Sequence, residues 1–310
     1  MTQNQKDTLQ KTIKTFSNSS LEFIDTKGLF SNIWENIPSK HHFSKEIFYK
    51  LIPARLFPQY DKIIITDVDV VFLGDVSESF LDFDTNSSSY LAGIKPNDPD
   101  GIFPLTNWKE GYKNFSEDEF KAIQYGIGAG YFIANLKAIR KDGIEEKWIN
   151  YASLNSHKLI LPEQDVLNII CYPYIDTLSL KHMVAHYAWK RFGENWEKLT
   201  PVIYSKKELD EANSYPIQIH YEGNKKPWVY VDEPKSELWF YYLAQTPFLK
   251  EYLAELPKTI IATHQKTLFS YRIKTYIKKN PSFFINPRFY LKIFDRLKYK
   301  LLKILNISQQ

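Results

Sequence analysis

Two carboxylates separated by one residue end an apolar run, and this spacing could hold a cation. Residues 63 to 78 read IIITDVDVVFLGDVSE, so Asp67 and Asp69 have apolar residues on both sides. Continuous apolar runs are typical of a strand covered on both faces, in which residues i and i+2 point to the same side. Neighbouring carboxylates in such a setting need a compensating positive charge. A divalent cation that prefers oxygen ligands would supply it, and so would a structural pairing with Lys or Arg.

The segments around this pair predict an α/β sheet. Residues 41 to 60 predict a helix that closes at prolines, residues 125 to 141 combine a Gly-rich start with a β-like apolar stretch, and a further helix is predicted to begin at Pro162. Strands interleaved with helices indicate an α/β sheet, on which ligands gather at the carboxyl ends of the strands. The aspartate pair lies at such an end.

Composition favours a soluble globular chain with a full core. The 310 residues are 44% hydrophobic, 25% charged and 16% aromatic, which does not fit a disordered protein. The single cysteine, Cys171, excludes a disulfide framework, and its apolar surroundings predict a buried packing residue. The first residues lack a secretory apolar core, and nowhere do about 18 apolar residues run uninterrupted, so export by that route and membrane spanning are not expected.

Charge is concentrated at the end of the chain. Residues 258 to 310 hold twelve Lys or Arg and one acid, although the whole chain has a net charge of +4. Residues 288 to 306 place apolar and basic side chains on separate faces of a predicted helix. This pattern fits either a helix that lies on an anionic membrane surface or one that docks on the protein with solvated lysines. No nucleic-acid-binding module is recognisable.

Three segments, in this order, resemble the family-8 retaining glycosyltransferases, which include bacterial lipopolysaccharide galactosyl- and glucosyltransferases and the glycogenins. YDKIIITDVDVVFLGDVSE is similar to the family's strand with its Asp-x-Asp motif, LPEQDVLN to its Asp-Gln-Asp segment, and HYEGNKKPW to its His-x-x-Gly-x-x-Lys-Pro-Trp segment. The resemblance covers roughly residues 5 to 235. It implies one Rossmann-like, GT-A type catalytic domain over residues 1–235, followed by a mostly helical basic region at 236–310.

The resemblance also implies roles for individual residues. Asp67, Asp69 and His220 would hold Mn²⁺, with Mg²⁺ as the alternative, on the diphosphate of a UDP-hexose, and Asp67 would thereby also belong to the donor site. Gly223 would let the backbone approach the phosphates, and Lys226 would neutralise the departing UDP.

Around the donor sugar the sequence matches the family in part. Gln164 matches the glutamine near the anomeric carbon, Lys50 takes the place of an arginine, and Asn135 matches a downstream asparagine assigned to the donor site. Glu163 stands for an aspartate, and Gly128 for an asparagine that contacts the sugar. Transfer with retention would proceed by front-face displacement through an oxocarbenium-like ion pair, or through a covalent intermediate on a carboxylate such as Glu163.

The expected function is metal-dependent, retaining transfer of a hexose from a UDP-sugar to a saccharide or glycolipid acceptor, in lipopolysaccharide or lipooligosaccharide synthesis. The expected location is the cytoplasm, peripheral on the inner face of the cytoplasmic membrane through residues 258–310. The family's first strand and helix, which cradle the uracil and ribose, have no counterpart here, since the sequence starts where its second helix would lie. The alternative expectation is therefore a catalytically inactive, incomplete transferase that acts as a binding module or scaffold.

Overall fold

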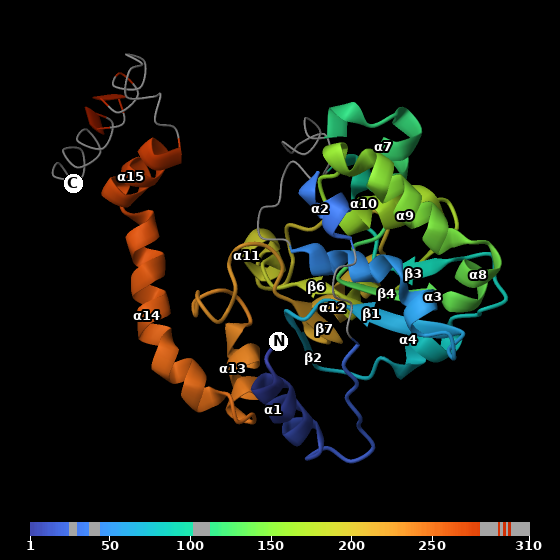
Figure 1. Cartoon of the computed structure of the whole chain (residues 1–310), viewed down its shortest axis with the longest axis horizontal. Helices are drawn as coiled ribbons and strands as arrows, with labels where there is room; N and C mark the ends of the chain where they lie inside the picture. Colours follow the sequence, from blue (N-terminus) through green and yellow to red (C-terminus); the bar gives the residue numbers. More distant parts are fainter. Residues whose placement is uncertain are drawn as a thin grey trace. The chain divides into compact units, whose positions relative to one another are not determined.

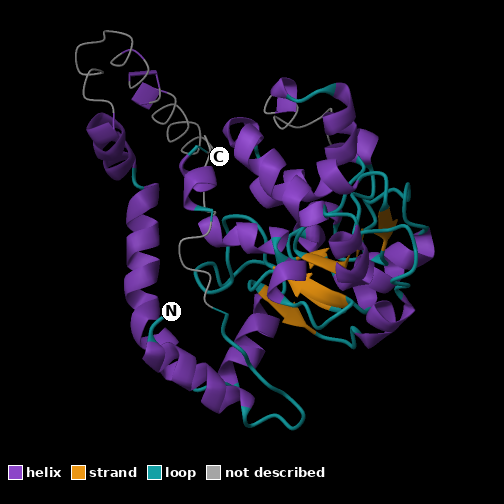
Figure 2. Cartoon of the chain, turned by 45° about the vertical axis from the view of Figure 1, so that its right-hand side comes forward, coloured by secondary structure: helices purple, strands orange, loops and turns teal. Residues whose placement is uncertain are grey.

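The computed structural model describes residues 1–24, 30–36, 44–101 and 112–279, together with residues 291, 294–295 and 297–298. The chain forms two compact units, Met1–Phe248 and Leu249–Gln310. The first unit holds both β-sheets among its helices, and the described part of the second is helical (Figure 1, Figure 2). This mixed α/β arrangement confirms the predicted fold class.

The larger sheet has the order β1-β4-β3-β5. Its strands are β1 (Lys62–Thr66), β4 (Tyr131–Asn135), β3 (Leu91–Gly93) and β5 (Ile175–Thr177). β4 runs antiparallel to both β1 and β3, whereas β3 and β5 are parallel. Every residue of β4 is buried. β4 is therefore the central strand against which the aspartate strand is aligned.

The aspartate strand is less covered than its apolar sequence predicts. All residues of β1 are half-buried, whereas an apolar run of this kind predicts burial on both faces. β1 lies at the end of the sheet order and pairs with β4 alone among the described strands. β1 is less buried than predicted because it lies at the edge of the sheet, and this position is set by pairing with strands that are distant in sequence.

A second sheet of three strands holds the histidine of the third motif. Its order is β2-β7-β6, with β2 (Val70–Phe72), β7 (Gln218–His220) and β6 (Val184–Ala185). β2 and β7 are antiparallel in a register that pairs Val70 with His220. The turn between β1 and β2 carries both aspartates, so this register brings the histidine beside them.

The helices cover the sheets and form the main core. In the first unit they are α1 (Gln3–Ile13), α2 (Ser31–Glu35), η1 (Lys45–Leu51), α3 (Pro53–Leu56), α4 (Ser77–Asp82), η2 (Tyr112–Asn114), α7 (Glu117–Gln124), α8 (Leu136–Lys141), α9 (Ile144–Asn155), η3 (Ser156–Lys158), α10 (Pro162–Cys171), η4 (Leu180–His182), α11 (Ala188–Phe192), α12 (Lys206–Ser214) and α13 (Ser236–Ala244). The core between α7, α9, α10 and η1 contains Trp148 and Cys171, both fully buried. The prediction of a buried, unpaired cysteine is thus confirmed.

Two predicted helices have clear local causes. The single helix predicted over residues 41 to 60 is, within the described chain, the 3₁₀ helix η1 followed by α3, and Pro53 begins α3 where it was predicted to close a helix, because proline is accommodated in a first turn. α10 begins at Pro162, as predicted. One carboxylate oxygen of Asp165 accepts hydrogen bonds from the N–H groups of Ile160 and Leu161, at 2.8 and 3.0 Å. These bonds fix the chain just before α10 and hence the start of the helix.

The second unit contains α14 (Leu249–Thr267) and α15 (Phe269–Lys279). No described helix combines the length and apolar character that crossing a membrane requires. The amphipathic helix predicted over residues 288 to 306 falls mostly outside the described residues. The assignment of catalysis to residues 1–235 and of membrane attachment to the region after them stays a prediction.

Candidate active site

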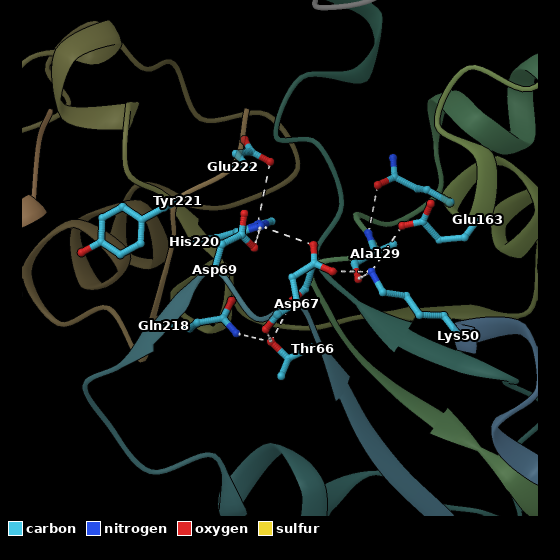
Figure 3. A network of polar contacts seen from close by, with 12 residues as sticks. Lys50, Thr66, Asp67, Asp69, Ala129, Glu163, Gln218, His220, Tyr221 and Glu222 are labelled. Atoms are coloured by element: carbon cyan, nitrogen blue, oxygen red, sulfur yellow. Dashed lines mark hydrogen bonds and ion pairs between the residues drawn. The ribbon is translucent and has the colours of Figure 1, made fainter. Parts of the chain in front are cut away.

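Asp67, Asp69 and His220 form a compact group, called here the carboxylate–histidine cluster. Nε2 of His220 lies 3.4 Å from Oδ2 of Asp67 and 3.3 Å from Oδ1 of Asp69 (Figure 3). One potential ligand atom from each residue lies within 4.8 Å of the other two. The structure thus brings together all three residues that the sequence assigned to a metal.

The ring of His220 lies against Gly130, the last glycine of the Gly-rich segment, directly before β4. A Cβ atom at Gly130 would lie 2.6 Å from both Cε1 and Nδ1 of the ring, closer than unbonded atoms approach. The carbonyl of Gly130 accepts hydrogen bonds from the N–H of Asp67 at 3.1 Å and from Oγ1 of Thr66 at 3.0 Å. A glycine is therefore needed where the aspartate turn, β4 and the histidine ring meet.

Two lysines neutralise the aspartates. Nζ of Lys50 lies 2.5 Å from Oδ1 of Asp67, and Nζ of Lys226 contacts Oδ2 of Asp69. Lys226 also donates to the carbonyl of Tyr221 at 2.7 Å. Lysine pairing, one of the two sources of positive charge that the sequence left open, is therefore present, and the paired aspartates also share a potential ligand set with His220.

The cations keep the cluster ionised. Burial would raise the pKa of Asp69, but the contacts with His220 and Lys226 outweigh burial and hold that pKa well below its usual range. The pKa of Asp67 is likewise lowered, because His220 and Lys50 outweigh burial. Burial lowers the pKa of His220, yet the two aspartates raise it overall to about 9. Ionised carboxylates are the form that binds a cation.

Lys50 also connects the aspartates to α10. Its Nζ donates to the carbonyl of Ala129 at 2.9 Å and lies 3.3 Å from Oε1 of Glu163. Gln164 binds the other polar backbone group of Ala129, because its Oε1 accepts the N–H of Ala129 at 2.9 Å. Of the two residues assigned to catalysis, Gln164 thus contacts the segment that leads into β4 directly, and Glu163 is connected to it through Lys50.

Glu163 is the most enclosed acid of the site. Its side chain is 8% exposed, and its Oε2 is buried without a hydrogen-bond partner among the described residues. Burial raises the pKa of Glu163 above its ordinary value despite the neighbouring Lys50. An unsatisfied buried oxygen is costly, so it marks a position where a polar ligand group would be accommodated.

Gly223 lies in the loop between His220 and Lys226. Its φ of +78° belongs to the left-handed region that glycine tolerates best. No described heavy atom lies within 4 Å of where a Cβ would stand, so space alone does not require glycine here. The backbone conformation explains the residue, and the open surroundings leave the main chain accessible.

Asn135 is not brought to the carboxylate–histidine cluster. It pairs with Lys62 at the start of β1, whereas Thr66, next to the aspartates, pairs with Tyr131 at the other end of β4. Its side-chain oxygen accepts the N–H of Ala138 and caps α8, and its amide donates to the carbonyls of Thr85 and Ser89. The contacts of Asn135 in this structure are those of a buried helix cap.

Two neighbours of the site were not found from the sequence. Met183 places its Cε 2.6 Å from the Cβ position of Gly128 and its Sδ 2.8 Å from that of Gly130. Its thioether covers both glycines, and no local pattern indicates this because Met183 is distant in sequence. Glu222 faces Nδ1 of His220 at 3.9 Å. Its place within HYEG, two residues after the histidine, was the available signal.

Comparison with known proteins gives a consistent result. The family model described as Glycosyl transferase family 8 matches residues 1–232. The apo structure of the WbbM bifunctional glycosyltransferase has a TM-score of 0.64 at 20% identity, over 82% of this chain and 44% of that one. The galactosyltransferase LgtC, in complex with donor and acceptor sugar analogues, has a TM-score of 0.59 at 15% identity, over 80% and 82%. These similarities show a shared GT-A type fold.

Curated relatives match in sequence over a shorter stretch. Xylosyl- and glucuronyltransferase LARGE2 of Mus musculus is 27% identical over 138 residues, which are 43% of this chain and 19% of the relative. Xylosyl- and glucuronyltransferase LARGE1 of Danio rerio is 24% identical over 155 residues, or 48% and 19%. The match therefore spans about a fifth of the length of these relatives.

Proposed function

The chain belongs to glycosyltransferase family 8, and from this premise we propose that it transfers a hexose, with retention, from a UDP-sugar to a saccharide acceptor. The observation that carries the proposal is the carboxylate–histidine cluster, whose ligand atoms lie within 4.8 Å of one another at the end of β1. The reaction proposed is metal-dependent. The similar fold of LgtC, a galactosyltransferase solved with donor and acceptor sugar analogues, supports the donor and acceptor classes.

The cluster fits a divalent cation in its chemistry. Two carboxylates and one imidazole suit Mn²⁺ well, with Mg²⁺ as the alternative. When bound, such an ion supplies positive charge against the diphosphate of the donor. Asp67, Asp69 and His220 would hold it, and the low pKa values of both aspartates keep them charged for this purpose.

A lysine and a backbone segment of the chain would also bind the diphosphate. Lys226 is 19% exposed at its side chain and contacts Asp69 of the carboxylate–histidine cluster. On donor binding it would turn from Asp69 to the phosphates, where it stabilises the charge of departing UDP. The main chain at Gly223, open and in the left-handed region, would approach the same phosphates.

Gln164 and Glu163 would lie at the reacting sugar. In front-face displacement the leaving phosphate takes the proton of the acceptor hydroxyl, and Gln164 stabilises the oxocarbenium-like ion pair through its side-chain amide. In the double-displacement route a carboxylate such as Glu163 attacks the anomeric carbon. Its side chain is 8% exposed and one of its oxygens is held by Lys50, and this enclosure favours the front-face route because a nucleophilic carboxylate has to reach the anomeric carbon.

Lys50 would position the residues around the reacting sugar without contacting the reacting atoms. It bridges Asp67 and Glu163 at 2.5 and 3.3 Å and holds the carbonyl of Ala129. Because lysine lacks the two-pronged geometry of arginine, it makes single contacts with each carboxylate. Its proposed role in donor binding is to hold these two acids in place relative to each other.

The test of activity uses the full chain with UDP-galactose or UDP-glucose, Mn²⁺ and lipooligosaccharide-type acceptors. We expect UDP release and glycosyl transfer that both disappear on chelation and in Asp69→Ala. Asp210→Asn, which removes an exposed carboxylate paired with Lys206, is the matched control and should behave like the wild type. Absence of hydrolysis and transfer with every donor, with no response to Asp69→Ala, contradicts the proposal and favours the binding-module alternative.

The proposed setting is lipopolysaccharide or lipooligosaccharide synthesis in the cytoplasm, at the inner face of the cytoplasmic membrane. The basic composition of residues 258–310 supports an anionic lipid surface as a partner. In α15 the basic side chains Arg272, Lys274 and Lys278 are exposed. Replacing all three by Gln in the full chain should weaken sedimentation with phosphatidylglycerol vesicles, and salt should weaken it further.

The control for this experiment changes three lysines of the first unit, Lys198, Lys206 and Lys207, to Gln. If both triple variants bind the vesicles equally, the basic region is not the attachment site.

A further inference from the structure

Nδ1 of His220 is buried and has no hydrogen-bond partner within the described part of the chain. The other ring nitrogen, Nε2, faces Asp67 and Asp69. A histidine that binds a metal through Nε2 carries its proton on Nδ1, and an acceptor at that proton fixes both the tautomer and the ring orientation. The structure therefore has to supply an acceptor on the Nδ1 side.

Glu222 lies on that side of the ring. Its Oε2 is 3.9 Å from Nδ1 of His220 (Figure 3). This separation is about 1 Å longer than a hydrogen bond, and Glu222 is 36% exposed at its side chain, so a modest rotation closes it. Since the aspartates face the opposite nitrogen, Glu222 does not add a fourth ligand to the cluster.

Tyr187 holds the second oxygen of the same carboxylate. Its hydroxyl donates to Oε1 of Glu222 at 2.5 Å. Tyr187 directly precedes α11, so its position is set by a helix and not by the loop that carries Glu222. One carboxylate oxygen thus accepts a hydrogen bond from the phenol of the residue that precedes α11, while the other faces the histidine ring.

The main chain of His220 is already fixed, which leaves the ring as the part that needs support. Its carbonyl accepts the N–H of His186 at 3.0 Å, and the next residue, Tyr221, donates its N–H to the carbonyl of Asp69 at 2.9 Å. Gly130 gives the ring a flat backbone surface and no polar side chain. Among these contacts, only that with Glu222 brings an acceptor oxygen to Nδ1.

We propose that Tyr187 and Glu222 are positioning residues that orient His220, with Glu222 accepting the Nδ1–H while Nε2 binds a divalent cation. The inference rests on the proposed metal site. It assigns Glu222 to metal affinity and not to contact with the sugars.

The test measures Mn²⁺ binding to the full chain without nucleotide, by the loss of the free-ion paramagnetic resonance signal. Glu222→Ala should weaken Mn²⁺ binding about 10- to 100-fold, the range for loss of such a supporting group. Glu222→Gln removes the same charge but keeps an acceptor oxygen, and should lie closer to the wild type. Tyr187→Phe should fall between the wild type and Glu222→Ala.

The control is Glu211→Gln, which removes an exposed carboxylate paired with Lys207 and should leave Mn²⁺ binding unchanged. Nitrogen-15 spectra of the histidine rings with diamagnetic Mg²⁺ should show one Nδ1–H tautomer for His220 in the wild type and a mixture in Glu222→Ala. Equal weakening by Glu222→Ala and Glu222→Gln reduces the effect to charge and overturns the positioning role. Binding by Glu222→Ala as tight as in Glu211→Gln overturns the inference entirely.

The variant Asp69→Ala distinguishes a refuted role of Glu222 from a refuted metal site, on which the proposed function depends. If Asp69→Ala leaves Mn²⁺ binding intact, the metal site itself is refuted. If Asp69→Ala abolishes binding while Glu222→Ala does not weaken it, the metal site stands and only the role of Glu222 is refuted.

Discussion

Replacing Gly130 by alanine tests whether the histidine ring needs the bare backbone beneath it. In the structure the added Cβ would lie 2.6 Å from Cε1 and Nδ1 of His220 and 2.8 Å from Sδ of Met183. Ordinary contact begins near 3.4 Å, so a neighbour has to retreat by roughly 1 Å. The flexible thioether can move, whereas the histidine ring lies between the glycine and the two aspartates.

The expected magnitude follows from that displacement. Moving a functional group by about 1 Å costs on the order of 100-fold in rate. A shift of the ring also disturbs the spacing of Nε2 from Asp67 and Asp69, which is now 3.4 and 3.3 Å. We therefore expect Gly130→Ala to weaken Mn²⁺ binding about 10- to 100-fold and to lower the transfer rate about 100-fold.

The assay combines a Mn²⁺ titration with initial rates of UDP release, and Gly128→Ala is the control. A Cβ at Gly128 would meet Cε of Met183 at 2.6 Å, but the ring of His220 is not among its nearest neighbours. Both variants thus displace the methionine and only one displaces the histidine. We expect Gly128→Ala to bind Mn²⁺ like the wild type.

Circular dichroism and melting temperatures establish whether both variants are folded. If folded Gly130→Ala binds Mn²⁺ as tightly as Gly128→Ala, or if both lose binding equally, the steric reasoning is refuted.

Three further changes test the supports of the site and the core. Lys50→Met removes the cation between two acids and should destabilise the fold by about 3–5 kcal/mol, seen as a lower melting temperature that Lys50→Arg partly restores. Burial raises the pKa of Glu119, but hydrogen bonds from Lys158 and a tyrosine outweigh it and lower that pKa. The Lys158–Glu119 pair therefore contributes about 1 kcal/mol to the free energy of unfolding above the unfolded pKa of Glu119, and this contribution is lost as pH falls through the folded pKa. In urea titrations the free energies of unfolding of the wild type and Glu119→Gln should therefore converge below about pH 4. Asn168 pairs with both backbone polar groups of Ile127, at 2.8 and 2.9 Å, and Asn168→Ala should cost about 3 kcal/mol in urea unfolding.

Each of these expectations has an outcome that contradicts it. An unchanged melting temperature in Lys50→Met means that the lysine is dispensable to the folded state. A stability difference for Glu119→Gln that stays constant from neutral to acid pH removes the pKa argument. A loss below about 1 kcal/mol in Asn168→Ala means that water or a rearranged backbone satisfies the freed groups.

The sequence was sufficient for the elements whose signals are local. Pro162 followed by acids predicts the start of α10, an apolar run predicts a strand ending at Asp67, and apolar neighbours predict the burial of Cys171. The resemblance of HYEGNKKPW to the family's His-x-x-Gly-x-x-Lys-Pro-Trp segment implied the roles of Gly223 and Lys226. These features depend on backbone preferences and periodicities within a few residues, and such preferences act along the chain.

Only the tertiary structure decided which of these residues meet. His220 reaches Asp67 and Asp69 because β2 and β7 pair in one register, and a slip by one residue would turn its ring to the other face. The same packing covers Gly128 with Met183, turns Asn135 into a helix cap and leaves β1 half-buried at a sheet edge. Contacts between distant segments depend on strand register and side-chain packing, which short-range patterns do not encode, and for that reason Glu222 and Gly130 became visible as supports of the histidine only in the folded chain.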